Sequence, residues 1–220
     1  MPEYEENKDD PQVLGRILST FKEQGCPTTD PDIMKLAEEW KKYANVENAR
    51  LQAEYEANNP AAAAKAAYDA GRYKDAIAKY REAMEDETDN DKKATMLFSI
   101  ASIEFRKLSL YSQARNTAYS AAKLKPNWGR PYILIGDMYG KTARSCGDPW
   151  DQRLAILAAI DKYNYAKSID GSTAGEVNDK LSHYYSSLPD KSEGFMRGVA
   201  EGQSASAGCW IGETVRLRFK

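Results

Sequence analysis

Three cysteines and one histidine are the side chains of this sequence best suited to metal binding or nucleophilic catalysis. They are Cys26, Cys146, Cys209 and His183. Thiolates and imidazoles ligate zinc, and they serve as nucleophile and base in hydrolases. Such sites usually show closely spaced ligands, as in CxxC, and no two of these four residues lie in one short segment. The spacing therefore predicts no metal site, and it predicts that His183 is a packing or surface residue.

Other catalytic signatures are also missing from the sequence. It contains no phosphate-binding loop of the Walker type and no GxSxG motif. Acidic side chains cluster between Glu82 and Glu87, where a predicted helix ends. Such a cluster is usually a charged surface exposed to solvent. We predict no catalytic residue, no cofactor and no enzymatic activity. A hydrolase that uses paired carboxylates is kept as the least favoured alternative.

The composition fits a folded protein rather than a disordered one. Hydrophobic residues make up 42% of the 220 residues and charged residues 29%, which argues against a disordered chain. The net charge of -2 gives no field that would recruit nucleic acid. The longest apolar run, 154–160, is far shorter than the roughly 20 residues of a membrane span. We therefore predict neither a nucleic-acid partner nor a membrane span.

Most of the sequence shows the periodicity of amphipathic helices, so helices would position the residues discussed above. Within residues 1–56, the segment "DDPQVLGRILSTFKEQG" carries one apolar stripe with the period of an amphipathic helix. A second helix is predicted to start with Asp30 as its N-cap and Pro31 in its first position. That helix either continues through "NVENARLQAEYEA" or breaks near Asn45. The two helices form a predicted N-terminal pair, which we interpret as a candidate degenerate repeat.

The segments after residue 57 repeat one another. Ala114, Ala118 and Ala121 stand where Ala76, Tyr80 and Ala83 stood, a shift of 38 residues (114 minus 76). A third copy ends in residues 159–166 with the same spacing. Small residues at these places let two helices approach closely, while large residues fill the space between them. The pattern predicts helical hairpins over 57–189, the last of them covered by a capping helix in "STAGEVNDKLSHYYSSLP" whose Val177 and Leu181 face inward.

These hairpins resemble tetratricopeptide repeats. The signature W-x2-L-G-x2-Y is matched by "YILIGDMY" with Tyr132, Ile135, Gly136 and Tyr139, and more loosely by "FSIASIEF". Pro126 closes the second copy as the signature asks. The resemblance implies an all-α fold, a right-handed α-solenoid of hairpins. It also implies a non-enzymatic scaffold for protein–protein interaction.

The C-terminal segment, residues 190–220, changes from helical to strand periodicity. Val215, Leu217 and Phe219 alternate with basic residues, which predicts a half-buried strand. The segment "AGCWI" is its predicted partner, with Gly212 near the turn. Because a lone β-hairpin is marginal in water, it is expected to lie against the helices or against a partner.

The third hairpin contains an insertion. Its second helix arrives about eleven residues late, and "SCGDP" is predicted to be a loop from which Asp148 and Pro149 start the next helix. The insertion and the "GCWI" segment together resemble exported repeat proteins typical of the Bacteroidetes. This resemblance implies that the chain is the C-terminal part of a longer protein of the periplasm or cell envelope, with the cytoplasm as the alternative.

The same resemblance gives the inserted cysteine a role. Cys146 and Cys209 form the candidate disulfide that it implies, one that would pin the hairpin to the last repeat in an oxidising compartment. The alternative is a pair of unrelated buried thiols, because free cysteine packs as a small hydrophobe. Cys26 is expected to be unpaired and buried.

The resemblance places a binding face on the first helix of each pair. Helical spacing puts these partner-binding candidates there: Lys65, Tyr68, Arg72, Ser99, Ile103, Arg106, Ile133, Asp137, Lys141 and Arg144. Cations mixed with apolar residues suit an extended peptide or a helix, and a merely solvated face is the equal alternative. The family's clamp for chaperone tails needs asparagines where this sequence has Lys65, Ser99 and Asp137. We predict a protein or peptide partner of another kind. An envelope assembly module that docks through its C-terminal segment is the alternative function.

Overall fold

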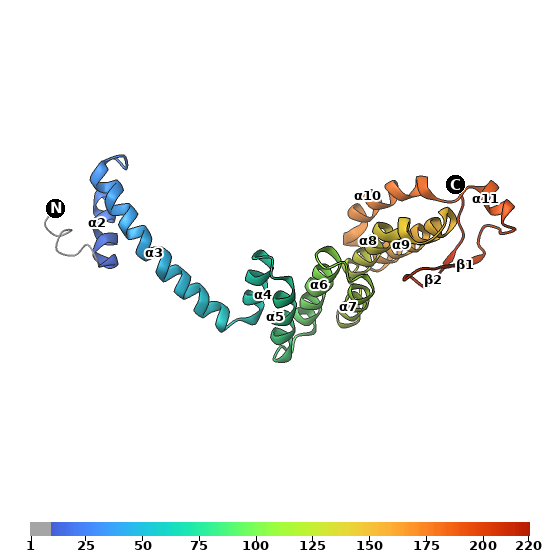
Figure 1. The fold of residues 1–220 in the computed structure, drawn as a ribbon, viewed down its shortest axis with the longest axis horizontal. Coiled ribbons are helices and arrows are strands. Elements are labelled where there is room, and N and C mark those ends of the chain that lie inside the picture. The colour runs from blue at the N-terminus through green and yellow to red at the C-terminus, as the bar shows by residue number, and fades with distance from the viewer. Residues whose placement is uncertain (1–9) are drawn as a thin grey trace. The chain divides into compact units, whose positions relative to one another are not determined.

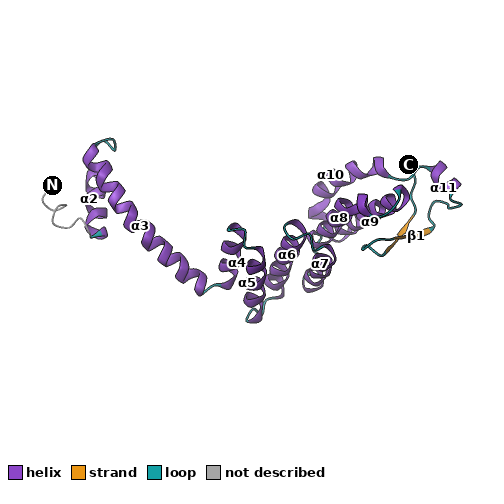
Figure 2. Ribbon diagram, in the orientation of Figure 1, coloured by secondary structure: helices purple, strands orange, loops and turns teal. Residues whose placement is uncertain are grey.

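The computed structural model describes residues 10–220, which form ten α-helices, three single-turn 3-10 helices and one two-stranded antiparallel sheet (Figures 1 and 2). The helices are α2 (Pro11–Glu23), α3 (Pro31–Ala57), α4 (Pro60–Asp69), α5 (Tyr73–Glu85), α6 (Asn90–Arg106), α7 (Tyr111–Leu124), α8 (Arg130–Thr142), α9 (Pro149–Ile169), α10 (Ala174–Tyr184) and α11 (Lys191–Met196). The 3-10 helices are η1 (Ala143–Ser145), η2 (Gly171–Thr173) and η3 (Tyr185–Ser187), and the strands are β1 (Ser204–Ala207) and β2 (Glu213–Arg216). The prediction of a mostly helical chain with a small C-terminal β-hairpin is confirmed.

The chain divides into two compact units, one that ends at Ala62 and one that spans Ala63–Lys220. The finer division into 1–56, 57–189 and 190–220 stays a prediction, and its first nine residues lie outside the described part of the chain. No helix within residues 10–220 combines the length and the apolar character that a membrane crossing requires.

The N-terminal unit is a pair of helices with a small core. The Asp30 carboxylate caps α3 by accepting hydrogen bonds from two backbone N–H groups, and Pro31 is the first helical residue, as predicted. The helix runs unbroken past Asn45 to Ala57. Leu14 and Leu36 are buried against each other. Cys26, which was expected to be buried, is partly exposed because it lies in the turn between the helices.

Small residues hold the helical pairs of the C-terminal unit together. Ala76, Ala114 and Ala159, the three aligned alanines, are fully buried in α5, α7 and α9. Gly136 of α8 lies so close to α9 that a Cβ atom there would stand 2.6 Å from the ring of Tyr163. Close approach of paired helices at these positions is what the repeated spacing predicts.

The capping helix and the inserted turn also form as predicted. Val177 and Leu181 of α10 are buried in the main core. Asp148 caps α9, and its carboxylate and that of Asp151 each accept a hydrogen bond from the other residue's backbone N–H. Ala159 is the eleventh residue of α9, whereas the matching alanines are the fourth residues of α5 and α7. The insertion therefore adds about two turns to the start of α9.

The β-hairpin packs on α9, but its strands differ in part from the predicted ones. β2 overlaps the predicted strand at Val215, which is buried, but it ends at Arg216, so Leu217 and Phe219 lie beyond it. Its partner is 204–207, paired from Ser204 opposite Arg216 to Ala207 opposite Glu213. Of the predicted partner "AGCWI", only Ala207 belongs to β1. The other four residues lie in the turn, where Cys209 and Gly212 adopt left-handed backbone conformations.

Polar contacts fasten the hairpin to three helices. The Glu213 carboxylate accepts hydrogen bonds from the hydroxyls of Tyr139 on α8 and Tyr119 on α7, and it pairs with Lys162 of α9 at 2.7 Å. Burial and the bond to Glu213 raise the pKa of Tyr139 well above its usual range. Arg115 of α7 donates to two backbone carbonyls of the turn. The C-terminal segment is thus an integral part of this unit.

Candidate binding face

Helices α6, α8 and α10 supply the walls of a hollow of about 250 Å³. Its lining comprises Phe98, Ser102 and Arg106 of α6, Arg130, Ile133, Leu134 and Asp137 of α8, and Glu176 of α10. We call this the small hollow. Two of its helices, α6 and α8, carry residues of the predicted binding face. The third, α10, is the capping helix and was not part of that prediction.

Charges in the small hollow compensate one another. The Asp137 carboxylate accepts a hydrogen bond from the hydroxyl of Tyr163 at 2.8 Å and pairs with the ammonium of Lys180 at 2.8 Å. The guanidinium of Arg106 approaches it at 3.7 Å. Burial, and then the negative charge of Asp137, raise the pKa of Tyr163 well above its usual range. Asp137 therefore serves mainly to join α8 to its neighbours.

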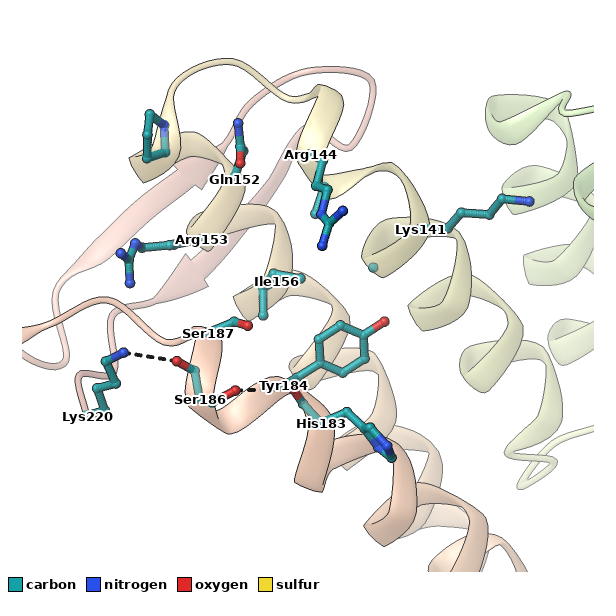
Figure 3. Close-up of a pocket in the computed structure, with 13 residues that line it drawn as sticks. Lys141, Arg144, Gln152, Arg153, Ile156, His183, Tyr184, Ser186, Ser187 and Lys220 are labelled. Atoms are coloured by element: carbon teal, nitrogen blue, oxygen red, sulfur yellow. Dashed lines mark hydrogen bonds between the residues drawn. The ribbon is translucent and has the colours of Figure 1, made fainter.

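A larger hollow of about 670 Å³ lies at the other end of α8 (Figure 3). Its walls come from the end of α8, from η1, from the added turns of α9, and from the end of α10 with η3. We call this the large hollow. Its lining residues are Gly140, Lys141, Ala143, Arg144, Pro149, Gln152, Arg153, Ile156, His183, Tyr184, Ser186, Ser187 and Lys220. Among the residues that the structure describes, no Asp or Glu lines it, so its charge is positive.

The cations around the large hollow differ in what they already bind. Arg153 pairs with Glu193 at 3.2 Å, and Lys220 lies 3.7 Å from Asp190. Lys141 has no ion pair within residues 10–220, and its ammonium lies over the ring of Phe105. Arg144 forms neither an ion pair nor a hydrogen bond in the described chain. Figure 3 shows its side chain pointing into the hollow, whereas Lys141 points away from it.

The structure brings together five of the ten predicted partner-binding residues. Arg106, Ile133 and Asp137 line the small hollow, and Lys141 and Arg144 line the large one. The other five line neither hollow: Lys65, Tyr68, Arg72, Ser99 and Ile103.

Four of these outlying residues are accounted for by local contacts. Lys65 and Arg72 form ion pairs with Asp69 and Asp75, which lie four and three residues further along the chain. Tyr68 packs against another tyrosine, and the Ser99 hydroxyl donates to a carbonyl of its own helix. These residues remain on the surface or near it, but they do not converge on a cavity.

Ile103 was predicted to lie on the open binding face, but the structure buries it. Its side chain is only 3% exposed and packs with Ala67 and Ile77 of the preceding hairpin. Ile133 is likewise nearly buried, although it borders the small hollow. Both positions belong to the helix–helix contact rather than to the accessible surface, so a partner would not reach Ile103.

Sequence reasoning missed several residues of the large hollow, notably Arg153, Ile156, Tyr184 and Lys220. Lys220 is 76 residues from Arg144 in the sequence (220 minus 144), and no local spacing predicts that they share a cavity. The signal that pointed here was the insertion, because repeat insertions often lie on a functional face.

The two cysteines of the candidate disulfide lie near each other. Cys146 follows η1 and is buried, Cys209 lies exposed in the hairpin turn, and both are free thiols. Burial, and then the neighbouring Cys209 thiol, raise the pKa of Cys146 to about 12. The fold thus brings the two sulfur atoms within reach of each other.

The residue types that bind metals or exchange protons can also be placed in the structure. Within residues 10–220, no group of three or more His, Cys, Asp or Glu side chains is arranged to hold a metal ion. His183 is exposed, and its ring nitrogen is bonded to the carbonyl of Asp179 at 2.7 Å. What the large hollow offers is positive charge over a partly apolar floor, and this is suited to holding an anionic group.

Comparison of the chain with protein-family models, with curated proteins and with solved structures gives no match. The resemblance to tetratricopeptide repeats therefore stays a prediction that rests on the residues quoted above.

Proposed function

We propose that this protein is a non-enzymatic scaffold whose tetratricopeptide-like hairpins stack as a right-handed α-solenoid and bind a peptide or a partner protein. The binding face is formed by α6, α8 and α10. One observation carries the proposal. Two hollows open on these helices, and Asp137, Lys141 and Arg144 connect them along α8 and η1 at spacings of four and three residues.

Chemistry supports a polypeptide as the ligand. The face alternates cations with apolar and aromatic side chains, so it offers contacts to both charged and hydrophobic residues of an extended segment. Lys141 borders the large hollow while its ammonium covers Phe105 of α6, close in sequence to Arg106 of the small hollow. A ligand that spans both hollows must be elongated, as a peptide is.

A random-peptide display selection against the intact chain tests this function. Enriched peptides are then measured by fluorescence anisotropy against the wild type and against an Arg106→Glu/Lys141→Glu variant. We expect the charge reversal to weaken binding by about tenfold or more, the effect of losing roughly 1.4 kcal/mol. The matched control is Lys123→Glu/Lys167→Glu, which makes the same charge change at exposed positions of α7 and α9. Failure to enrich any peptide, or equal binding by both double variants, would contradict the proposal.

A second candidate function is an assembly module of the cell envelope that docks through its C-terminal segment. It is favoured by Phe195 and Met196 of α11, which are 86% and 84% exposed. Adjacent apolar side chains left in water commonly mark an interaction surface. The export that the resemblance implies would place such a module in the periplasm, and the cytoplasm is the alternative. A Phe195→Ser/Met196→Ser variant that loses a partner while retaining peptide binding would favour this second function.

A further inference from the structure

We infer that the large hollow is a subsite that captures a side-chain carboxylate of an acidic peptide segment, with Arg144 as the residue that binds it. This inference rests on the proposed function and names the ligand chemistry of one end of the face. Within residues 10–220, the cavity is lined by cations and by no acids, and the side chain of Arg144 has no ion-pair or hydrogen-bond partner; this combination carries the inference.

Arg144 is the cation left to bind a ligand. On the opposite wall, acidic side chains of the C-terminal segment already pair with the cations: Glu193 with Arg153, and Asp190 with Lys220. Within the described part of the chain, no acid does the same for Arg144. Its planar guanidinium presents paired N–H donors that match the two oxygens of a carboxylate.

The floor of the hollow suits the rest of an acidic side chain. Arg144 points toward Ile156 and Tyr184, which lie across the cavity in Figure 3. Methylene groups of a Glu or Asp residue would lie against these apolar surfaces while the carboxylate meets the guanidinium. The Ser187 hydroxyl has no hydrogen bond within residues 10–220, which leaves a second polar donor in the lining.

Size and continuity favour a peptide over a small anion. Ligand cavities typically measure about 300–1,000 Å³, and this one, at about 670 Å³, holds more than a single carboxylate. Lys141 leads from this hollow toward Phe105 and the small hollow. A carboxylate bound by Arg144 would thus belong to a chain that continues along α8.

A double-mutant cycle tests the inference. Display-selected peptides are expected to carry an Asp or Glu whose replacement by Asn or Gln weakens binding about tenfold or more, as for a lost hydrogen bond to a charged group. Arg144→Gln should weaken the parent peptide equally. In the Arg144→Gln variant, replacing the acidic residue of the peptide should cause no further loss of affinity, because the two groups contact each other. Arg144→Lys should weaken binding less than Arg144→Gln, since it keeps the charge.

Two controls separate the possible outcomes. Arg216→Gln removes an exposed arginine of β2 outside both hollows and should leave affinity unchanged. Inorganic phosphate is added as competitor, and its binding at micromolar concentration through Arg144 would overturn the carboxylate assignment. Peptides that bind without an acidic residue, or whose acid is not coupled to Arg144, would overturn the subsite and leave the proposed function standing. A selection that enriches nothing would overturn both.

Discussion

Oxidation of Cys146 and Cys209 to a disulfide would stabilise the C-terminal unit by joining the inserted turn of α8 and α9 to the β-hairpin. In the structure both are free thiols, and the Cys209 thiol is near enough to raise the pKa of Cys146. The reaction with oxidised glutathione proceeds by thiol–disulfide exchange. The exposed Cys209 thiolate displaces one glutathione, and Cys146 then displaces the second. The protein loses two protons and two electrons, and one glutathione disulfide becomes two glutathione thiols.

The size of the effect follows from the length of the closed loop. The two cysteines are 63 residues apart (209 minus 146). The loop-entropy relation then gives about 4 kcal/mol of stabilisation, chiefly through a more restricted unfolded chain. For a domain of this size, such a change raises the melting temperature by roughly 10 °C.

Circular dichroism melting after oxidation, with and without reductant, measures the shift, and peptide mapping identifies the bond. The protein carries Cys26→Ser so that only two thiols can react. The matched control is Cys209→Ser, which changes an exposed side chain and should melt at the same temperature in both conditions. Two free thiols after oxidation would refute the argument from proximity. A mapped Cys146–Cys209 bond without a change in melting temperature would refute the argument from loop closure.

Three further outcomes follow from packing and charge. Gly136→Ala should lower the free energy of unfolding in urea by about 1–3 kcal/mol because its Cβ meets a tyrosine ring, whereas Gly175→Ala, with open space around it, should be neutral or stabilising. Glu213→Gln should lower the free energy of unfolding by about 1–3 kcal/mol and speed amide hydrogen exchange in β2, because it removes the charge that faces Lys162. Unchanged hydrogen exchange would contradict this. Since the pKa of Cys146 is raised to about 12 from 9.0, unfolding releases its proton above pH 9, and the reduced wild type should lose stability relative to Cys146→Ala between pH 9 and 12. If the stability of the two proteins changed with pH in parallel, burial would not raise the pKa of the Cys146 thiol.

Local signals were enough to predict the helices and their close contacts. Asp30 and Asp148 cap their helices because a short acidic side chain before a proline is a strong start signal that needs no tertiary information. The buried alanines were also predictable, since a 38-residue repeat of small residues has few explanations other than packing.

Long-range contacts determine what the sequence did not show. The strand "SASA" has little apolar character of its own and pairs because β2 is already held by the helices. Ile103 shares its helical face with accessible residues, so periodicity alone does not reveal that a neighbouring hairpin covers it. The large hollow joins side chains from four separate stretches of the chain, 140–144, 149–156, 183–187 and Lys220, and only folding brings them together.

The packing of the hairpin on α9 has a consequence for biosynthesis. Translation delivers α9 before β1 and β2, yet Ile211, Val215 and Leu217 are part of the same buried cluster as Leu154 and Leu157. While the nascent chain is still attached to the ribosome, that side of α9 exposes apolar side chains that can associate with other chains. A premature stop codon anywhere before β2 would make this state permanent, so even short C-terminal truncations should yield chains that aggregate or are degraded by quality-control proteases.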